Sequence, residues 1–349
     1  MKSVGIKVSA GVLAVATTAF ALLYHGHTYD RAWEHDETHH WQRATCGCDE
    51  ISGLEEHSVG DDGFCWICAR PLETTAGVEY AILENEQRAK VVRFFGGVDQ
   101  NRVNISSEYQ NLPVTEIGEG AFESLDSLTT VILPTTVTSI GIRAFFGCSS
   151  LTDLQIQGKI TTIDKAAFYG CERLEGFEIP KTVMEIGEFA FANCNGLTEV
   201  TIPDGVRVLS RGLFTGCIKL TEVTFGSGVT EIGASAFAHC AKLSQVKIPS
   251  GVTSIGDGAF NSCNGLRDIV LPESLTSIGE HAFGSIFGLK VYYEGVEGAW
   301  GKISIGEGNP VNPYYYSESE PAKNSDGTAY EGRYWRYVDG VPTVWEIIG

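Results

Sequence analysis

A repeat of 23 residues constrains the fold of this chain more than any other feature of its sequence. Eight phenylalanines follow one another at this step: Phe122, Phe145, Phe168, Phe191, Phe214, Phe237, Phe260 and Phe283. Isoleucine and leucine positions keep the same step, as at Ile140 and Ile163 or at Leu151 and Leu174. A unit this short cannot bury its apolar side chains alone, so successive units must stack on one another in a solenoid.

Each unit contains two short segments of alternating polarity. In the first, the apolar Val200 and Ile202 are separated by the polar Thr201, and a proline ends the run. This alternation predicts a half-buried strand. The second segment, as in residues 252–256, ends at a glycine, and the Ala-Phe residues after it have room for one helical turn. The expected fold class is a β-rich solenoid, a leucine-rich repeat array of eight 23-residue coils with short helical corners, capped at both ends.

The unit reads LxxVxIPxxVxxIGxxAFxxCxxL in residues 243–266, and it resembles the BspA-like leucine-rich repeats of bacterial surface proteins. The resemblance implies an extracellular, non-enzymatic surface or secreted protein that holds other macromolecules. Its partner would be a protein or glycan ligand on a host or neighbouring cell surface. A structural component of the cell envelope is the alternative.

The charge of the chain excludes one class of partner. The 349 residues include 25 Lys and Arg against 44 Asp and Glu, which gives a net charge of −19. A protein that binds along the phosphate backbone needs a basic stripe. We therefore expect no nucleic-acid partner.

The sequence does not predict an enzyme. The closest catalytic pattern, HDETH at residues 35–39, has aspartate where the HExxH motif of metallopeptidases needs its glutamate base. The nucleophile-elbow, P-loop and dinucleotide-binding glycine patterns do not occur in the sequence. A non-catalytic protein is the expectation.

The first residues have the pattern of an export signal. Lys2 and Lys7 precede an uncharged run over residues 8–23, and Ala19-Phe20-Ala21 fits a cleavage site. We expect residues 1–21 to be a signal peptide and the protein to be secreted or held at the cell surface. The alternative is an uncleaved N-terminal segment, the one membrane contact that the sequence suggests.

Six of the ten cysteines occupy one position of the repeat: Cys148, Cys171, Cys194, Cys217, Cys240 and Cys263. The first and last units carry Leu125 and Ile286 there, so the position is apolar in character. Side chains stacked in parallel do not favour the torsion angle of a disulfide. We expect a ladder of buried thiols, with disulfides between coils as the alternative.

The other four cysteines precede the repeats, with histidines close to them. Cys46, Cys48, Cys65 and Cys68 surround His57, and thiolates and imidazoles are the ligands that tetrahedral zinc prefers. The segment also resembles a Cys/His module found ahead of such repeats. We expect a structural zinc bound by these five residues. Two disulfides or unpaired thiols are the alternatives.

The flanks complete the expected domain organisation. Residues 22–76 form the Cys/His-rich module, and the apolar runs of residues 77–113 predict an N-terminal capping hairpin. The solenoid covers residues 114–294. Residues 292–349 hold 8 of the 13 tyrosines, and residues 295–349 are expected to form an aromatic C-terminal cap or, alternatively, a platform for sugar rings.

The outward positions of the first strand are the candidate binding residues. They include Glu178, Glu199, Thr201, Glu222 and Thr224. Such positions vary between coils while the core positions barely change, which lets a solenoid carry a recognition surface on a constant frame. A basic or polyhydroxylated partner fits these side chains. The alternative is that they merely solvate the sheet.

Overall fold

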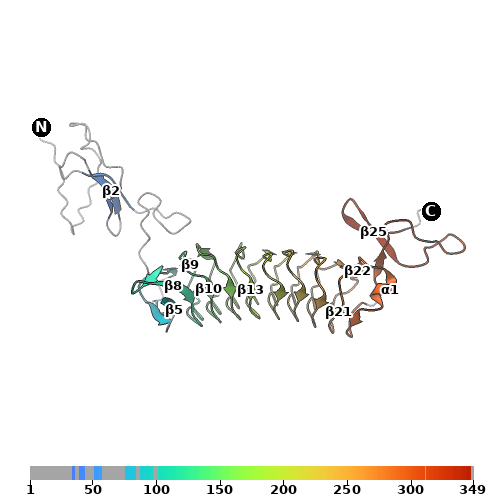
Figure 1. Ribbon diagram of the computed structural model, residues 1–349, viewed down its shortest axis with the longest axis horizontal. Helices are drawn as coiled ribbons and strands as arrows, with labels where there is room; N and C mark the ends of the chain where they lie inside the picture. Colours follow the sequence, from blue (N-terminus) through green and yellow to red (C-terminus); the bar gives the residue numbers. More distant parts are fainter. Residues whose placement is uncertain are drawn as a thin grey trace. The chain divides into compact units, whose positions relative to one another are not determined.

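The structure is a computed structural model (Figure 1) that describes residues 75–83, 87–96, 101–310 and 312–346, and the backbone of strands before them. The chain divides into two compact units, Met1–Thr75 and Ala76–Gly349. In the first unit, β1 (Glu34–His35), β2 (His39–Arg43) and β3 (Ile51–Glu56) form an antiparallel sheet. The expected signal peptide lies outside the described residues.

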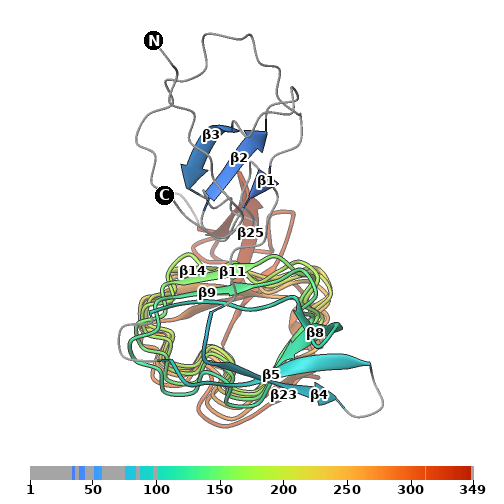
Figure 2. The same cartoon turned by 90° about the vertical axis from the view of Figure 1, so that its left-hand side faces the viewer.

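The second unit is the solenoid that the repeat predicts, with strands on two sides of the stacked coils (Figure 2). We call one side the long-strand face. Its strands are β6 (Arg102–Asn104), β9 (Thr130–Leu133), β11 (Asp153–Ile156), β14 (Glu199–Thr201), β16 (Glu222–Thr224), β18 (Gln245–Val246), β20 (Asp268–Leu271) and β22 (Lys290–Tyr293).

We call the other side the short-strand face. Its strands are β5 (Arg88–Phe94), β8 (Leu112–Ile117), β10 (Ser139–Ile140), β12 (Thr162–Ile163), β13 (Glu185–Ile186), β15 (Val208–Leu209), β17 (Glu231–Ile232), β19 (Ser254–Ile255), β21 (Ser277–Ile278) and β23 (Ser304–Ile305). Paired strands on both faces run parallel. Most paired residues in the repeats are 23 positions apart, as Ile232 and Ile255 are, whereas β20 and β22 pair at a step of 22. The predicted solenoid is therefore confirmed.

The corners of the coils differ from the expectation of a helical turn. At the corner that contains Phe260, the amide of Phe260 donates to the carbonyl of Ala282 in the next coil, at 2.7 Å. The amides of Ala259 and Asn261 donate within their own coil, to Gly256 and Gly258. A helix directs every amide along its own segment, so this alternation between coils excludes a helix. The corners are hydrogen-bonded turns, and the expectation of helical corners was wrong.

The repeated phenylalanines form a continuous ladder through the core. All eight, from Phe122 to Phe283, are at most 3% exposed. Consecutive rings lie 5.1 to 5.6 Å apart between centroids and are within 12° of parallel. This offset stacking is one of the favoured geometries of aromatic pairs. Each ring therefore ties one coil to the next.

A second ladder runs beside the rings. The six repeat cysteines are buried free thiols, as predicted. Each Sγ donates to a phenylalanine carbonyl 26 residues earlier, at 2.9 to 3.2 Å. The thiols thus satisfy carbonyl groups where the coils meet.

These thiols should not react with alkylating agents in the folded protein. They should also make the free energy of unfolding sensitive to alkaline pH. Burial raises the pKa of the Cys217 thiol from about 9 to about 12. The folded state therefore keeps a proton that the unfolded chain loses, so the free energy of unfolding should fall as pH rises through this interval and be unaffected by the thiol below it. Urea unfolding between pH 8 and pH 11 measures this. Residue-mapped alkylation of Cys217 at pH 8 without unfolding would contradict the account.

Both ends of the repeat array continue into other elements. β4 (Val78–Leu83) pairs antiparallel with β5, and β7 (Glu108–Tyr109) pairs with β8. After the repeats, α1 (Glu297–Trp300) precedes β24 (Tyr314–Tyr316), β25 (Tyr334–Val338) and β26 (Val341–Val344), which extend the sheet of β22. In the described part of the chain, no helix has the length and apolar character needed to cross a membrane.

Candidate binding face

Four of the candidate binding residues lie on two neighbouring strands of the long-strand face. β14 and β16 pair in register, so Glu199 lies opposite Glu222 and Thr201 lies opposite Thr224. These four residues are exposed, whereas Val200, which lies between Glu199 and Thr201 on β14, is only 4% exposed. The alternation of the strand therefore brings two carboxylates and two hydroxyls to one surface.

Glu178 belongs to the preceding coil, where the strand is missing. It occupies the position equivalent to Thr201 and is exposed. Residues 174–180 form no strand, and Gly176 has a φ of +61°, which lies outside the extended region that a strand requires. Glu178 is therefore not joined to Glu199 by strand pairing. The glycine is visible in the sequence and was the available signal for this break.

The two paired glutamates form no ion pair with a described residue. The ion pairs between described residues are Arg143–Glu123, Lys165–Glu188 and Lys323–Glu320, and none of them involves β14 or β16. Like charges directly opposite each other destabilise a sheet by a few tenths of a kcal/mol to about 1 kcal/mol. The face therefore presents unneutralised negative charge that folding does not require.

The five residues expected to bind zinc, Cys46, Cys48, His57, Cys65 and Cys68, lie outside the described residues. Among the residues that the structure does describe, no group of three or more His, Cys, Asp or Glu side chains is placed to hold a metal ion.

The aromatic C-terminal segment uses its rings mainly for packing. Trp335 is fully buried, and its Nε1–H donates to a carbonyl of β22 at 3.0 Å. The guanidinium carbon of Arg333 lies 4.2 Å from the centre of the Tyr314 ring. The guanidinium carbon of Arg336 lies 3.9 Å from the centre of the Trp345 ring. Because cations occupy these ring faces, the contacts favour a structural role over a platform for sugar rings.

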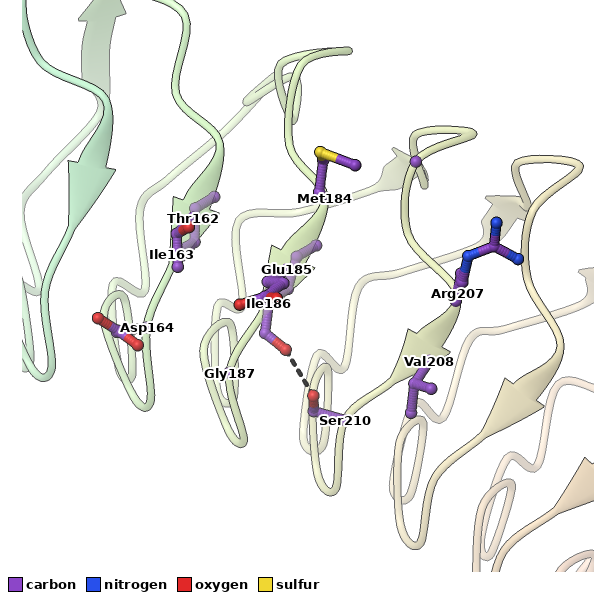
Figure 3. Close-up of a pocket in the computed structure, with 11 residues that line it drawn as sticks. Thr162, Ile163, Asp164, Met184, Glu185, Ile186, Gly187, Arg207, Val208 and Ser210 are labelled. Atoms are coloured by element: carbon purple, nitrogen blue, oxygen red, sulfur yellow. Dashed lines mark hydrogen bonds between the residues drawn. The ribbon is translucent and has the colours of Figure 1, made fainter.

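The sequence analysis missed a hollow on the short-strand face. It extends over β12, β13 and β15, has a volume of about 540 Å³ and is lined by residues that include Asp164, Glu185 and Ser210 (Figure 3). A signal was present in the sequence, because Arg207 and Ser210 stand where most coils carry threonine and glycine.

Comparisons with known proteins agree with this architecture. A family model described as the BspA type leucine-rich repeat region, with six copies of the repeat, matches residues 100–213 and 184–293. These overlapping matches span more than half of the 349 residues. No curated protein matches the chain.

Solved structures of leucine-rich repeat proteins are also similar. One, from Bacteroides ovatus ATCC 8483, is 25% identical over 67% of this chain and 67% of that chain, with a TM-score of 0.58. Another, the leucine rich repeat protein of T. pallidum, is 29% identical over 62% of this chain and 90% of that chain, with a TM-score of 0.46.

Proposed function

Because the chain belongs to the family of BspA type leucine-rich repeat proteins, we propose that it is an exported bacterial surface or secreted protein that binds other macromolecules and has no catalytic role. Its partner is a protein or glycan ligand on a host or neighbouring cell surface. The binding site is the part of the long-strand face that carries Glu178, Glu199, Thr201, Glu222 and Thr224.

The observation that carries this proposal is the unneutralised pair of glutamates on β14 and β16. Glu199 and Glu222 lie opposite each other on adjacent strands, which are about 4.8 Å apart in a sheet. Their mutual repulsion is relieved when a partner supplies positive charge or hydrogen-bond donors. The exposed hydroxyls of Thr201 and Thr224 add donors and acceptors beside the carboxylates. A basic or polyhydroxylated partner satisfies all four groups.

Features of the N-terminal segment support the rest of the proposal. The basic residues Lys2 and Lys7 followed by the apolar run of residues 8–23 support export. We also propose that the Cys/His module holds a structural zinc through Cys46, Cys48, His57, Cys65 and Cys68.

A binding screen with the full chain tests the proposed site. Purified matrix proteins, mucins and bacterial surface polymers are immobilised, and binding is measured over a range of salt concentrations. We expect saturable binding that weakens as salt screens the charges. Replacing Glu178, Glu199 and Glu222 together by lysine should weaken it by about tenfold or more while the melting temperature stays nearly unchanged.

A matched triple variant distinguishes the effect of charge at these three positions from the effect of the net charge of the protein. Glu231, Glu273 and Glu280 are exposed glutamates away from β14 and β16, and their replacement by lysine changes the net charge equally. This control should bind like the original protein. If both triple variants lose binding alike, or if neither does, the long-strand face is not the site.

A further inference from the structure

The short-strand face has one interruption within its described strands. Every neighbouring pair from β5 to β23 is hydrogen-bonded except β13 and β15. In the other coils an amide just after the strand donates to the preceding coil, as Gly187 does to Ile163 O at 2.7 Å and Gly233 does to Leu209 O at 2.8 Å. The amide of Ser210 forms no such bond. Its hydroxyl donates to the carbonyl of Ile186 instead (Figure 3).

The side chains of this coil explain why the ladder opens. Before the short strand, most coils carry a threonine, such as Thr230, whose Oγ1 donates to the preceding coil. After the strand most carry glycine, because a Cβ on Gly233 would lie 2.4 Å from Leu209 O. Arg207 and Ser210 replace both residues in the coil of β15.

Coils with only one of these replacements stay paired. Asp164 stands at the glycine position, and its amide still donates to Ile140 O at 2.8 Å. Met184 stands at the threonine position, and its amide still donates to Thr161 O at 2.9 Å. The coil of β15 carries both departures, and it is the coil in which the strands separate.

The corner and the core between these two coils stay closed. Just beyond the strands, the amide of Phe189 donates to Arg211 O at 2.9 Å. In the core, the rings of Phe191 and Phe214 stay stacked at 5.6 Å. The two coils therefore stay joined at the corner and in the core, although their strands are unpaired on the long-strand face as well as at the hollow.

The two sides of the hollow carry complementary backbone groups that no neighbouring coil satisfies. On the side of β15, the amides of Arg207 and Ser210 donate to no carbonyl of the coil of β13. On the side of β13, the carbonyl of Met184 accepts no amide from the coil of β15. A peptide bond carries both a donor and an acceptor, so an extended peptide can satisfy both sides.

The side chains around the hollow select for positive charge. Asp164 and Glu185 both line it, and neither forms an ion pair with a described residue. Burial, and then the nearby charge of Glu185, raise the pKa of Asp164. Figure 3 shows the Arg207 guanidinium directed away from Glu185. Met184, which also lines the hollow, is 62% exposed and offers an apolar contact for an aliphatic stem.

We propose that this hollow binds an extended segment of a partner protein through a basic residue. The segment lies across the hollow, where its backbone accepts a hydrogen bond from the Arg207 amide and donates one to the Met184 carbonyl. Its Lys or Arg side chain lies against Asp164 and Glu185. The site is on the short-strand face, so it is separate from the proposed site on β14 and β16.

A capped pentapeptide, Thr-Val-Lys-Val-Thr, is the probe for this site. Its addition to the isotope-labelled full chain should cause saturable shifts of the Arg207 and Ser210 amide resonances. The same peptide with Gln in place of Lys should bind about tenfold more weakly, because the carboxylates lose their counter-charge. Absence of saturable shifts at millimolar peptide, or equal binding of the two peptides, would overturn the proposal.

Variants of the protein provide the second arm of the test. The double variant Asp164→Asn with Glu185→Gln should lower the affinity for the Lys peptide by about tenfold. Glu231→Gln is the matched control, since Glu231 is the counterpart of Glu185 in a coil where the strands are paired, and it should change nothing. The variant Arg207→Thr with Ser210→Gly restores the common repeat residues and should abolish peptide binding and slow amide exchange at both positions. Undiminished binding in either double variant would refute the site.

Discussion

Replacing Phe191 by alanine should destabilise the protein by about 3 to 5 kcal/mol, the usual cost of deleting a buried aromatic side chain. Phe191 is fully buried in a central coil and stacks on Phe168 at 5.3 Å and on Phe214 at 5.6 Å. Phe177 also contacts its ring, at 5.6 Å. The substitution removes contacts on both sides of the coil, and the surrounding rings cannot close the cavity without moving the backbone.

Urea unfolding followed by circular dichroism measures this loss. Phe287→Ala is the control, because Phe287 is 89% exposed and its removal should change the free energy of unfolding by less than about 0.5 kcal/mol. Equal effects of the two substitutions would mean that the phenylalanine ladder does not hold the coils together.

Replacing Trp335 by alanine should detach the C-terminal strands from the last coils, at a cost of about 3 to 5 kcal/mol to that region. Trp335 is fully buried, contacts Tyr292 and Tyr316 at 5.3 Å each, and donates its Nε1–H to Tyr293 O. Because each unit of a solenoid contacts only its neighbours, the loss should stay near the end of the array.

Limited proteolysis and amide exchange distinguish this local effect from global unfolding. We expect faster exchange in β25 and β26, with little change at β14 or β16. Val341→Ala in the same hairpin is the control, since Val341 is 60% exposed. Uniformly faster exchange over the whole solenoid would show that the C-terminal segment is needed for the fold itself.

The parts of the fold that the sequence predicts are those fixed by the side chains of a single coil. The 23-residue step identifies the buried position of Phe191, and the alternation around Val200 identifies the strand and its exposed residues. The thiol ladder follows from the apolar residues that replace cysteine in the end units. Each inference needs only burial and periodicity.

The parts that were wrong or missed depend on hydrogen bonds between coils. The corner at Phe260 forms no helix because its amide donates to the next coil, which no pattern within one unit reveals. Glu178 lacks a strand because Gly176 adopts a left-handed conformation. The hollow needs two departures, Arg207 and Ser210, in the same coil. Both residues are visible in the sequence, but their effect on the neighbouring strand requires the structure.

Amide exchange of the full chain, with and without a macromolecule captured in the binding screen, tests the central claim most directly. Our account predicts that binding slows exchange selectively in β14 and β16, around Val200 and Val223, and that high salt removes this protection. Protection confined to β25 and β26, or no protection of the long-strand face at saturation, would contradict the assignment of that face as the binding surface.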